Sequence, residues 1–559
     1  MSRTLLRIVG SLGALALLLG ACTGAAEQGA TPLASPTPSP EEEPDPETSE
    51  PEATPIEESD PAEEFEEDAA VLSVAIPEPA TIDPIRIQDP GSTLVARQLF
   101  EGLTRWDPAA EEVVPAAARS WTAADGGQTF RFTLEPGMTF HDGTPVTSRD
   151  FKYAFERIAR RKNASDLAYT LDRVKGFLQV NQLGDKKRLN GIRTPDDNTL
   201  VIRLSEPYQD FPAVLTHPGL VPLPKASVKN LDAFLSEPVG NGPFKMARSW
   251  TPGDPVVLEA FEDYFAGPPA LDGVAFMPVV DAAQSWLSFD KGDLDVAEVP
   301  IGQFDYAAGK YGAEGYQPFL AGYYYGLNMK SRVLRTARAR QAVNLAIDRE
   351  AIATDIYRGS MEPPRGIIPR GMPGFGDNLC ASLCSYRPAQ ARRLVKRLPK
   401  EGRTLRLDYT RGEPHAQVAR AVKRDLQRAG FRVTAKGHPF RKHLRRLTAG
   451  KGDVFRLGWI AEYPAADVFL TSLFDSASPD NHSGFDSPRV DALLDRAHRR
   501  KDKDRRLALY RRAERAIMRR MPILPIGSFT THWAVQPAVR GIEFDAMGGF
   551  DAAGVSIER

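Results

Sequence analysis

Cysteine and histidine are both scarce in this chain of 559 residues, with three and eight copies. Nickel and similar metals take histidine ligands, and the near pair His438 and His443 is expected on an exposed basic stretch. We therefore expect no metal and no other cofactor. Cys380 and Cys384 are separated by three residues and predict a local disulfide. A metal-binding pair is the weaker alternative, because no histidine lies close to them in sequence.

The sequence also lacks the short motifs of common enzyme classes. It contains no Gly-x-Ser-x-Gly, no His-Glu-x-x-His and no phosphate-binding P-loop. These motifs carry the nucleophile, the metal ligands or the phosphate cradle of their respective enzymes. A secreted hydrolase is therefore disfavoured, and we expect a protein that is not an enzyme.

Long apolar runs are absent after the first twenty or so residues. The run Ile8–Leu19 is too short for a membrane-spanning helix, which needs roughly 20 residues. Two arginines precede this run, and it ends in LGAC, which resembles a bacterial lipobox. This order predicts a lipoprotein signal peptide over residues 1–22, with a lipid on the thiol of Cys22. An ordinary secretory signal cleaved near Ala21 is the alternative.

The segment 23–68 is rich in proline and then strongly acidic. Residues 1–68 hold 16 Asp and Glu but 2 Lys and Arg. Such a segment has little apolar surface to offset its ordering entropy, so we expect a disordered tether. Subtracting these charges from the totals of 73 and 71 leaves 57 acids and 69 bases, a formal charge of +12 for residues 69–559.

The basic excess lies largely in arginines of the stretches 387–406 and 492–520. These stretches lack interleaved aromatic residues, and the chain carries an export signal, so we expect no nucleic-acid partner. Solvated helix faces, some of them near anionic lipid, are the better interpretation. The remaining chain is too long for one core and suggests two or three domains.

Local periodicity predicts mixed α and β structure. Residues 128–134 alternate apolar and polar residues, as a strand does, and Thr147 or Ser148 is placed to cap a helix with Phe151 on its apolar face. The order strand, helix, strand over 404–434 predicts a β-α-β unit. A long amphipathic helix is predicted over 338–357. Strands and helices without strict alternation indicate α/β lobes.

Several segments, in this order, resemble the bacterial solute-binding proteins of family 5, the oligopeptide-, dipeptide- and nickel-binding subunits of ABC importers. The resemblance covers nearly all of residues 71–530. The segments are Leu94–Arg105 (LVARQLFEGLTR), Phe140–Thr147 (FHDGTPVT), Val239–Phe244 (VGNGPF), Tyr323–Asn328 (YYYGLN), Arg340–Arg349 (RQAVNLAIDR), Gly458-Trp459 and Met521–Pro525 (MPILP).

The resemblance implies a two-lobed periplasmic-binding-protein fold of type II, cluster C, with the ligand cleft between the lobes. It places lobe I at 69–326, with an extra subdomain at about 115–235. Lobe II follows at 327–515, and residues 516–559 return to lobe I. Closure about a hinge would bury the ligand at the lobe interface.

The segment Asp453–Pro464 (DVFRLGWIAEYP) is the strongest candidate for a ligand site. Peptide-binding members resemble Gly-Trp-x-Ala-Asp-Tyr here, and their aspartate holds the ligand amine; this chain has Glu462 instead. Arg456 matches an arginine that binds the ligand carboxylate. The alternative is that both are exposed strand-end charges and that the tryptophan belongs to the core. Further candidates for the pocket walls are Trp459, Tyr463, Tyr323, Tyr324 and Asn328.

We therefore expect a lipid-anchored, monomeric receptor on the outer face of the cytoplasmic membrane. It would capture short peptides and deliver them to the permease subunits of an ABC importer, whose ATPase is cytoplasmic. A nickel complex, haem or another solute remains an alternative ligand. A signalling or adhesion lipoprotein that takes no part in transport remains an alternative role.

Overall fold

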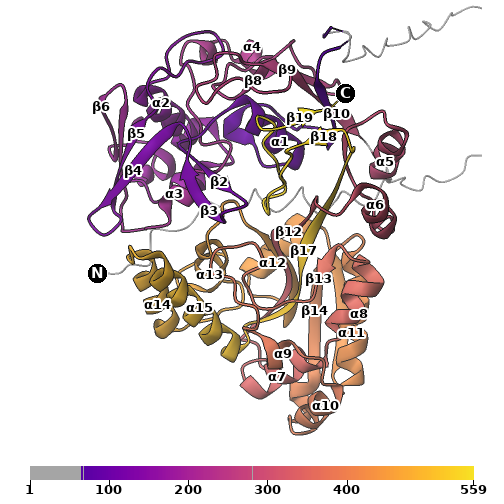
Figure 1. Cartoon of the computed structure of the whole chain (residues 1–559). Helices are drawn as coiled ribbons and strands as arrows, with labels where there is room; N and C mark the ends of the chain where they lie inside the picture. The colour runs from indigo at the N-terminus through magenta and orange to yellow at the C-terminus, as the bar shows by residue number, and fades with distance from the viewer. Residues whose placement is uncertain (1–64, 67, 280, 559) are drawn as a thin grey trace, which may run out of the picture.

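The computed structural model describes residues 65–66, 68–279 and 281–558. The signal peptide 1–22 with Cys22, and nearly all of the tether 23–68, lie outside these residues. Two lobes lie one above the other, and the long strands at the centre connect them (Figure 1). Within the described residues no helix is both long and apolar enough to span a bilayer.

An eleven-stranded sheet runs through both lobes and positions the site. Its strands in spatial order are β15 (Arg432–His438), β14 (Thr404–Thr410), β16 (Val454–Ile460), β12 (Tyr316–Leu327), β17 (Ile523–Val535), β11 (Val296–Glu298), β1 (Val71–Pro77), β10 (Gly273–Val279), β9 (Val256–Ala260) and β8 (Phe244–Met246), with β13 (Met361–Glu362) paired to β17.

Strands β12 and β17 form the connection between the lobes. They pair antiparallel from Tyr316↔His532 to Gly326↔Ile523, with two register shifts. At one end β17 pairs with β11 of the upper lobe, and at the other β12 pairs with β16 of the lower lobe. We therefore place the division between the lobes inside these two strands.

The first lobe carries a second, four-stranded sheet inside the region 115–235. It has the order β4 (Ala118–Ala124), β5 (Thr129–Leu134), β7 (Thr199–Arg203) and β6 (Ile192–Asp196). The predicted strand at 128–134 is confirmed as β5, whose alternate residues Phe130, Phe132 and Leu134 are buried. The predicted helix is confirmed as α2 (Ser148–Ala159), since Thr147 and Asp150 form a reciprocal capping box.

The other elements of the first lobe flank these two sheets. They are α1 (Pro90–Leu99), β2 (Thr104–Asp107), β3 (Glu112–Pro115), α3 (Phe211–Val214), α4 (Leu231–Ser236), α5 (Ala282–Lys291), α6 (Phe304–Tyr311), β18 (Val539–Arg540) and β19 (Ser556–Ile557). Trp533, Phe544 and Phe550 near the C-terminus belong to the same buried core as Leu72 and Phe276. The end of the chain therefore packs on the first lobe.

The second lobe places helices on both faces of the sheet. They are α7 (Ala337–Ala346), α8 (Arg349–Ile352), α9 (Ala381–Cys384), α10 (Pro388–Lys396), α11 (His415–Arg428), α12 (Phe440–Thr448), α13 (Asp467–Phe474), α14 (Pro488–His498) and α15 (Lys503–Arg520). The predicted β-α-β unit is confirmed, because β14 and β15 pair in parallel around α11. Cys380 and Cys384 are joined by a disulfide.

The single helix predicted over 338–357 is wrong. Helix α7 ends at Ala346, and α8 begins anew at Arg349. The side chain of Asp348 accepts a hydrogen bond from the backbone N–H of Ala351, as an N-cap residue does. Ile347 and Asp348 are extended and interrupt the helix, and Asp348 caps the start of α8. The helical spacing of apolar residues nevertheless continues through this break.

Candidate ligand-binding site between the lobes

Strand β16 carries two of the seven expected ligand residues, Arg456 and Trp459, and its two faces contact different cores. Arg456 shares one face with Tyr323 and Tyr325 of β12, beside the core that includes α7 and α11. Trp459 and Tyr324 pack on the opposite core, which includes α13 to α15. This separation follows from the alternation of side chains along a strand. Arg456 and Trp459 are therefore not walls of one pocket.

The outer edge of β16 lacks a neighbouring strand over most of its length. Strand β14 pairs with it at Val454 and Phe455 and not beyond, within the described residues. The backbone carbonyl of Arg456 points to this edge, where it accepts a 2.7 Å hydrogen bond from Nε2 of His443. Backbone direction alternates along a strand, so Gly458 and Ile460 also present their polar groups there. An extended peptide would find partners at this edge.

Arg456 is a buried cation with unused hydrogen-bond donors. Its side chain is 2% exposed, and its guanidinium carbon lies 4.6 Å from the ring centroid of Tyr323. Among the described residues, Nε and Nη2 of Arg456 have no hydrogen-bond partner, and no carboxylate lies within 4.0 Å. Most buried donors in proteins are satisfied, so the unpaired donors of this guanidinium are an exception. The interpretation of Arg456 as an exposed strand-end charge is wrong.

Two histidines stand near Arg456 without adding charge. Burial, and then the positive charge of Arg456, lowers the pKa of His415 to about 3. The pKa of His443 falls to about 4, chiefly through burial. The Tyr323 hydroxyl lies 3.4 Å from Nδ1 of His415. Both imidazoles are neutral at pH 7, so the positive charge among these side chains is that of Arg456.

The exposed placement expected for His438 and His443 is wrong. Both are buried, with relative exposures of 3% and 0%. His438 pairs through Nε2 with Asp408 at 3.2 Å, and His443 is turned inward from α12 toward β16. His438 is the last residue of β15, and His443 lies in α12. The basic residues around His443 occupy the outer face of α12.

Glu462 lies just beyond the end of β16, where the second lobe meets the first. Burial, reinforced by the charge of Asp480, raises its pKa to about 8, and a hydrogen bond with the Tyr169 hydroxyl opposes that rise. Tyr169 belongs to a short helical turn of the first lobe, Ala168–Leu171. The carboxyl group therefore faces the lobe interface and is largely protonated at neutral pH.

The other expected residues divide into two groups. Tyr463 packs against the cores of both lobes, and Trp459 is half-buried on the second. Asn328 lies at the opposite end of β12, where its side-chain amide donates to the carbonyls of Gly450 and Gly452 at 3.1 and 3.0 Å. Asn328 thus holds a turn, and we leave it out of the proposed ligand site.

A buried polar network next to Glu462 joins the lobes. Asp467, the first residue of α13, pairs with Arg173 of the first lobe at 3.4 Å and with His498 at 2.5 Å. Arg173 stacks over the ring of Tyr208, with its guanidinium carbon 4.2 Å from the centroid. Contacts with His498, Arg173 and the Thr471 hydroxyl hold the pKa of Asp467 below its usual range despite burial. The network ties the loop that carries Glu462 to the first lobe.

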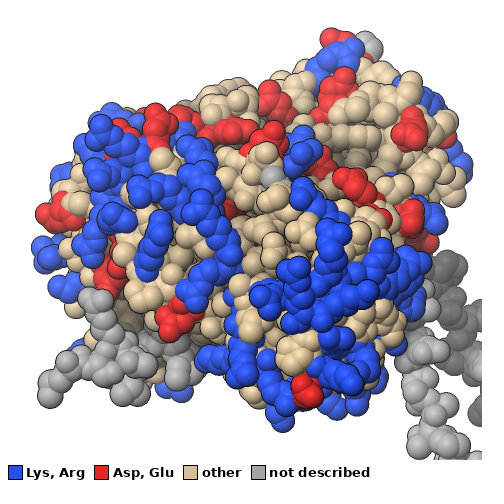
Figure 2. Space-filling view, turned by 90° about the horizontal axis from the view of Figure 1, so that it is seen from below, with Lys and Arg blue, Asp and Glu red and all other residues tan. Residues whose placement is uncertain are grey.

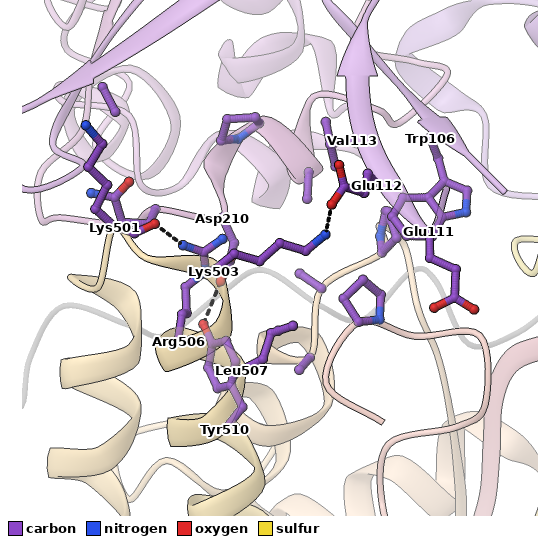
Figure 3. Close-up of a pocket in the computed structure, with 18 of the residues that line it drawn as sticks. Trp106, Glu111, Glu112, Val113, Asp210, Lys501, Lys503, Arg506, Leu507 and Tyr510 are labelled. Atoms are coloured by element: carbon purple, nitrogen blue, oxygen red, sulfur yellow. Dashed lines mark hydrogen bonds and ion pairs between the residues drawn. The ribbon is translucent and has the colours of Figure 1, made fainter. Parts of the chain in front are cut away.

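A cavity of about 430 Å³ lies at the lobe interface beyond this network (Figure 3). Asp210 of the first lobe accepts a 2.7 Å hydrogen bond from the Tyr510 hydroxyl and forms a 2.7 Å ion pair with Arg506. Lys503 pairs with Glu112 across the same gap. None of the expected ligand residues lines this cavity, although Pro464–Ala466 do. It lies beside the expected ligand residues rather than among them.

Sequence reasoning missed Tyr169, Arg173 and His415. Each lies far along the chain from Asp453–Pro464 and belongs to no short motif. Tyr169 meets Glu462, and Arg173 meets Asp467, only when the two lobes pack together. His415 comes near Arg456 only when α11 packs on the sheet. No local signal in the sequence identifies them.

Two α/β lobes joined by two crossing strands, with charged groups at their interface, define a solute-binding protein of the bilobed type. The sequence model described as "Bacterial extracellular solute-binding proteins, family 5 Middle" matches residues 112–481. The chain belongs to this family, and the two-lobed fold expected from the resemblance is confirmed.

Individual relatives support this assignment along most of the chain. The oligopeptide-binding protein OppA of Bacillus subtilis is 26% identical over 84% of this chain and 89% of its own length. The probable deoxycholate-binding protein YgiS of Escherichia coli is 28% identical over 80% of this chain and 86% of its own length. The unliganded open form of the murein tripeptide-binding protein MppA superposes with a TM-score of 0.77 at 24% sequence identity. The match covers 88% of this chain and 98% of the MppA chain.

Proposed function

We propose that this chain is the lipid-anchored solute-binding subunit of an ABC importer and that it captures short peptides between its lobes. It would be a receptor without chemistry of its own, held at the outer face of the cytoplasmic membrane through Cys22. A permease with its cytoplasmic ATPase would take the ligand from it. Relatives named for oligopeptide and murein-peptide binding support this proposal.

The observation that carries the proposal is the arrangement of charges along β16. Arg456 offers unused donors for a carboxylate, and Glu462 offers an oxygen ligand for an amine. Glu462 is six positions after Arg456, which corresponds to about 20 Å in an extended chain. The open edge between them supplies backbone partners that do not depend on the ligand's side chains. A short extended peptide matches all three features.

The decisive experiment uses the unlipidated mature chain, residues 23–559. Native mass spectrometry against a pool of two- to five-residue peptides should retain free-amine peptides and lose their N-acetylated counterparts. Glu462→Gln should weaken retention by about tenfold or more, because a charge-assisted hydrogen bond is lost. Glu350→Gln, at an exposed position, is the control. If a folded chain retains no peptide, the ligand is a non-peptide solute.

A second candidate ligand is an apolar carboxylate without an amine. The aromatic rings of Tyr323 and Tyr325 beside Arg456 suit such an acid, and the raised pKa of Glu462 weakens that residue as an amine anchor. One relative is named for deoxycholate binding. Retention of a bile acid by the native chain, lost in Arg456→Met and kept in Glu462→Gln, would favour this candidate.

A further inference from the structure

Exposed cations gather on the distal end of the second lobe. Seen from below, Lys and Arg cover much of this end, with few acidic residues among them (Figure 2). We call this surface the α10 face, and its exposed members include Arg387, Arg392, Arg393, Lys396, Arg397 and Lys400.

Hydrogen bonds bring further cations to the same surface from distant segments. Arg432, at the start of β15, donates to the carbonyl of Lys400 at 3.3 Å. Arg403 donates to the carbonyl of Lys396 at 2.8 Å and so closes the end of α10. The α10 face is therefore a built surface and not a single charged helix.

The cations that define this face have no carboxylate partner. None of the six lies within 4.0 Å of an acidic group in the described part of the chain, whereas Arg406, Arg420 and Arg446, elsewhere on the second lobe, are all ion-paired. Like charges four residues apart on a helix, such as Arg392 and Lys396, repel one another. An external anionic surface would relieve this repulsion.

An anionic bilayer fits the face better than a protein partner does. Tyr386 stands beside these cations at 41% exposure, and tyrosine is favoured at the level of lipid headgroups. Arginine binds phosphate oxygens in a bidentate manner. Each cation brought close to an anionic leaflet adds to the attraction, so a cluster of six is effective.

The chain is long enough to let this face reach a membrane that holds its N-terminus. The described chain begins in the first lobe, where the ring of Phe65 lies against Gly273. Residues 23–64 number 42 and reach at most ~140 Å. A globular chain of this size is about 60 Å across. A lipid on Cys22 would therefore permit contact of the second lobe with the same membrane.

We propose that the α10 face docks the second lobe on an anionic phospholipid surface. This inference rests on the proposed membrane attachment, but its test does not need the lipid. The unlipidated chain 23–559 should co-sediment with phosphatidylcholine vesicles containing one quarter phosphatidylglycerol. It should not co-sediment with pure phosphatidylcholine vesicles, and high salt should release it.

A matched pair of variants tests the location of the contact. Arg392→Glu/Arg393→Glu/Lys396→Glu should weaken vesicle binding by about tenfold or more. Arg441→Glu/Lys442→Glu/Arg445→Glu changes the charge equally on α12, on the other side of the sheet, and should change binding by less than about threefold. Melting temperatures of both variants equal to that of the native chain would show that they are folded, and this readout does not depend on the proposed function.

Three results would overturn the proposal. The first is that the chain 23–559 does not bind anionic vesicles at low salt. The second is that both triple variants lose binding equally, which would indicate that net charge alone drives the binding. The third result is that a chain of residues 65–559 binds vesicles whereas residues 23–559 do not. The acidic segment within residues 23–64 would then occupy the α10 face.

Discussion

The hydroxyl of Tyr169 in the first lobe hydrogen-bonds the carboxyl group of Glu462 in the second, across the lobe interface. The hydrogen bond favours the ionised carboxylate, but burial outweighs it and the pKa stands at about 8. In the ligand-free protein Glu462 is therefore largely uncharged at pH 7. An incoming ammonium group must displace a proton.

The first prediction concerns this proton. Affinity for a free-amine peptide should rise with pH between about 6 and 8, by up to about tenfold per pH unit, because the bound carboxylate is ionised and the free one is not. Isothermal titration calorimetry in buffers of different ionisation enthalpy should detect release of the proton. Glu462→Gln should remove the dependence. Affinity that is constant over this range would contradict the assignment of Glu462 as the amine anchor.

The same raised pKa also affects stability, which should fall with rising pH although peptide affinity rises. The folded, ligand-free chain favours the protonated carboxyl, since the folded pKa of about 8 exceeds the ordinary value of 4.5. Its contribution to the unfolding free energy is present in full below the ordinary pKa and is lost as pH rises through about 8. Comparing urea denaturation of the native chain and Glu462→Gln at pH 6 and 9 isolates it.

The second prediction separates binding from stability at Arg456. Arg456→Met should keep or raise the free energy of unfolding, by up to ~2 kcal/mol, because it removes a buried charge that has no counter-charge. The same variant should bind a peptide acid and its C-terminal amide equally, whereas the native chain should prefer the acid. Arg441→Met, at an exposed position, should change neither property. A variant that unfolds but keeps the preference would assign Arg456 a structural role.

The third prediction concerns the interlobe network. Asp467→Asn should lower the free energy of unfolding by about 1–3 kcal/mol, because it removes the buried acceptor that Arg173, His498 and Thr471 share. The folded pKa of Asp467 is depressed, so its contribution is present above the ordinary pKa and is lost as pH falls. Urea denaturation followed by tryptophan fluorescence measures both. The exposed Asp495→Asn on α14 serves as the control, and a loss no larger than the control's would contradict the prediction.

The fourth prediction concerns a close approach between two backbone segments. A Cβ on Gly240 would lie 1.9 Å from the carbonyl oxygen of Leu99, at the end of α1. Gly240→Ala should destabilise the chain by about 1–3 kcal/mol, through displacement of that segment. Gly309, in α6, has open space around its Cβ position, so Gly309→Ala should be neutral or stabilising. Thermal unfolding compares the two, and equal melting temperatures would contradict the prediction.

The sequence by itself determined the features that depend on neighbours along the chain. Period-two alternation gave the strand around Phe130 and Phe132, and the Thr147–Asp150 box fixed the start of α2. The order of motifs over 71–530 determined the family and hence the two lobes. These patterns succeed because hydrogen bonding within a turn or strand is set by residues a few positions apart.

The tertiary structure alone decided which side chains meet. It turned His443 inward from a basic helix, left Arg456 buried without a carboxylate partner, and set Tyr169 against Glu462 across the lobe interface. Burial and distant charges determine the protonation of such groups, and neither is encoded by spacing along the chain. Helix faces and strand edges are local properties, whereas a ligand site between two lobes exists only after both have packed.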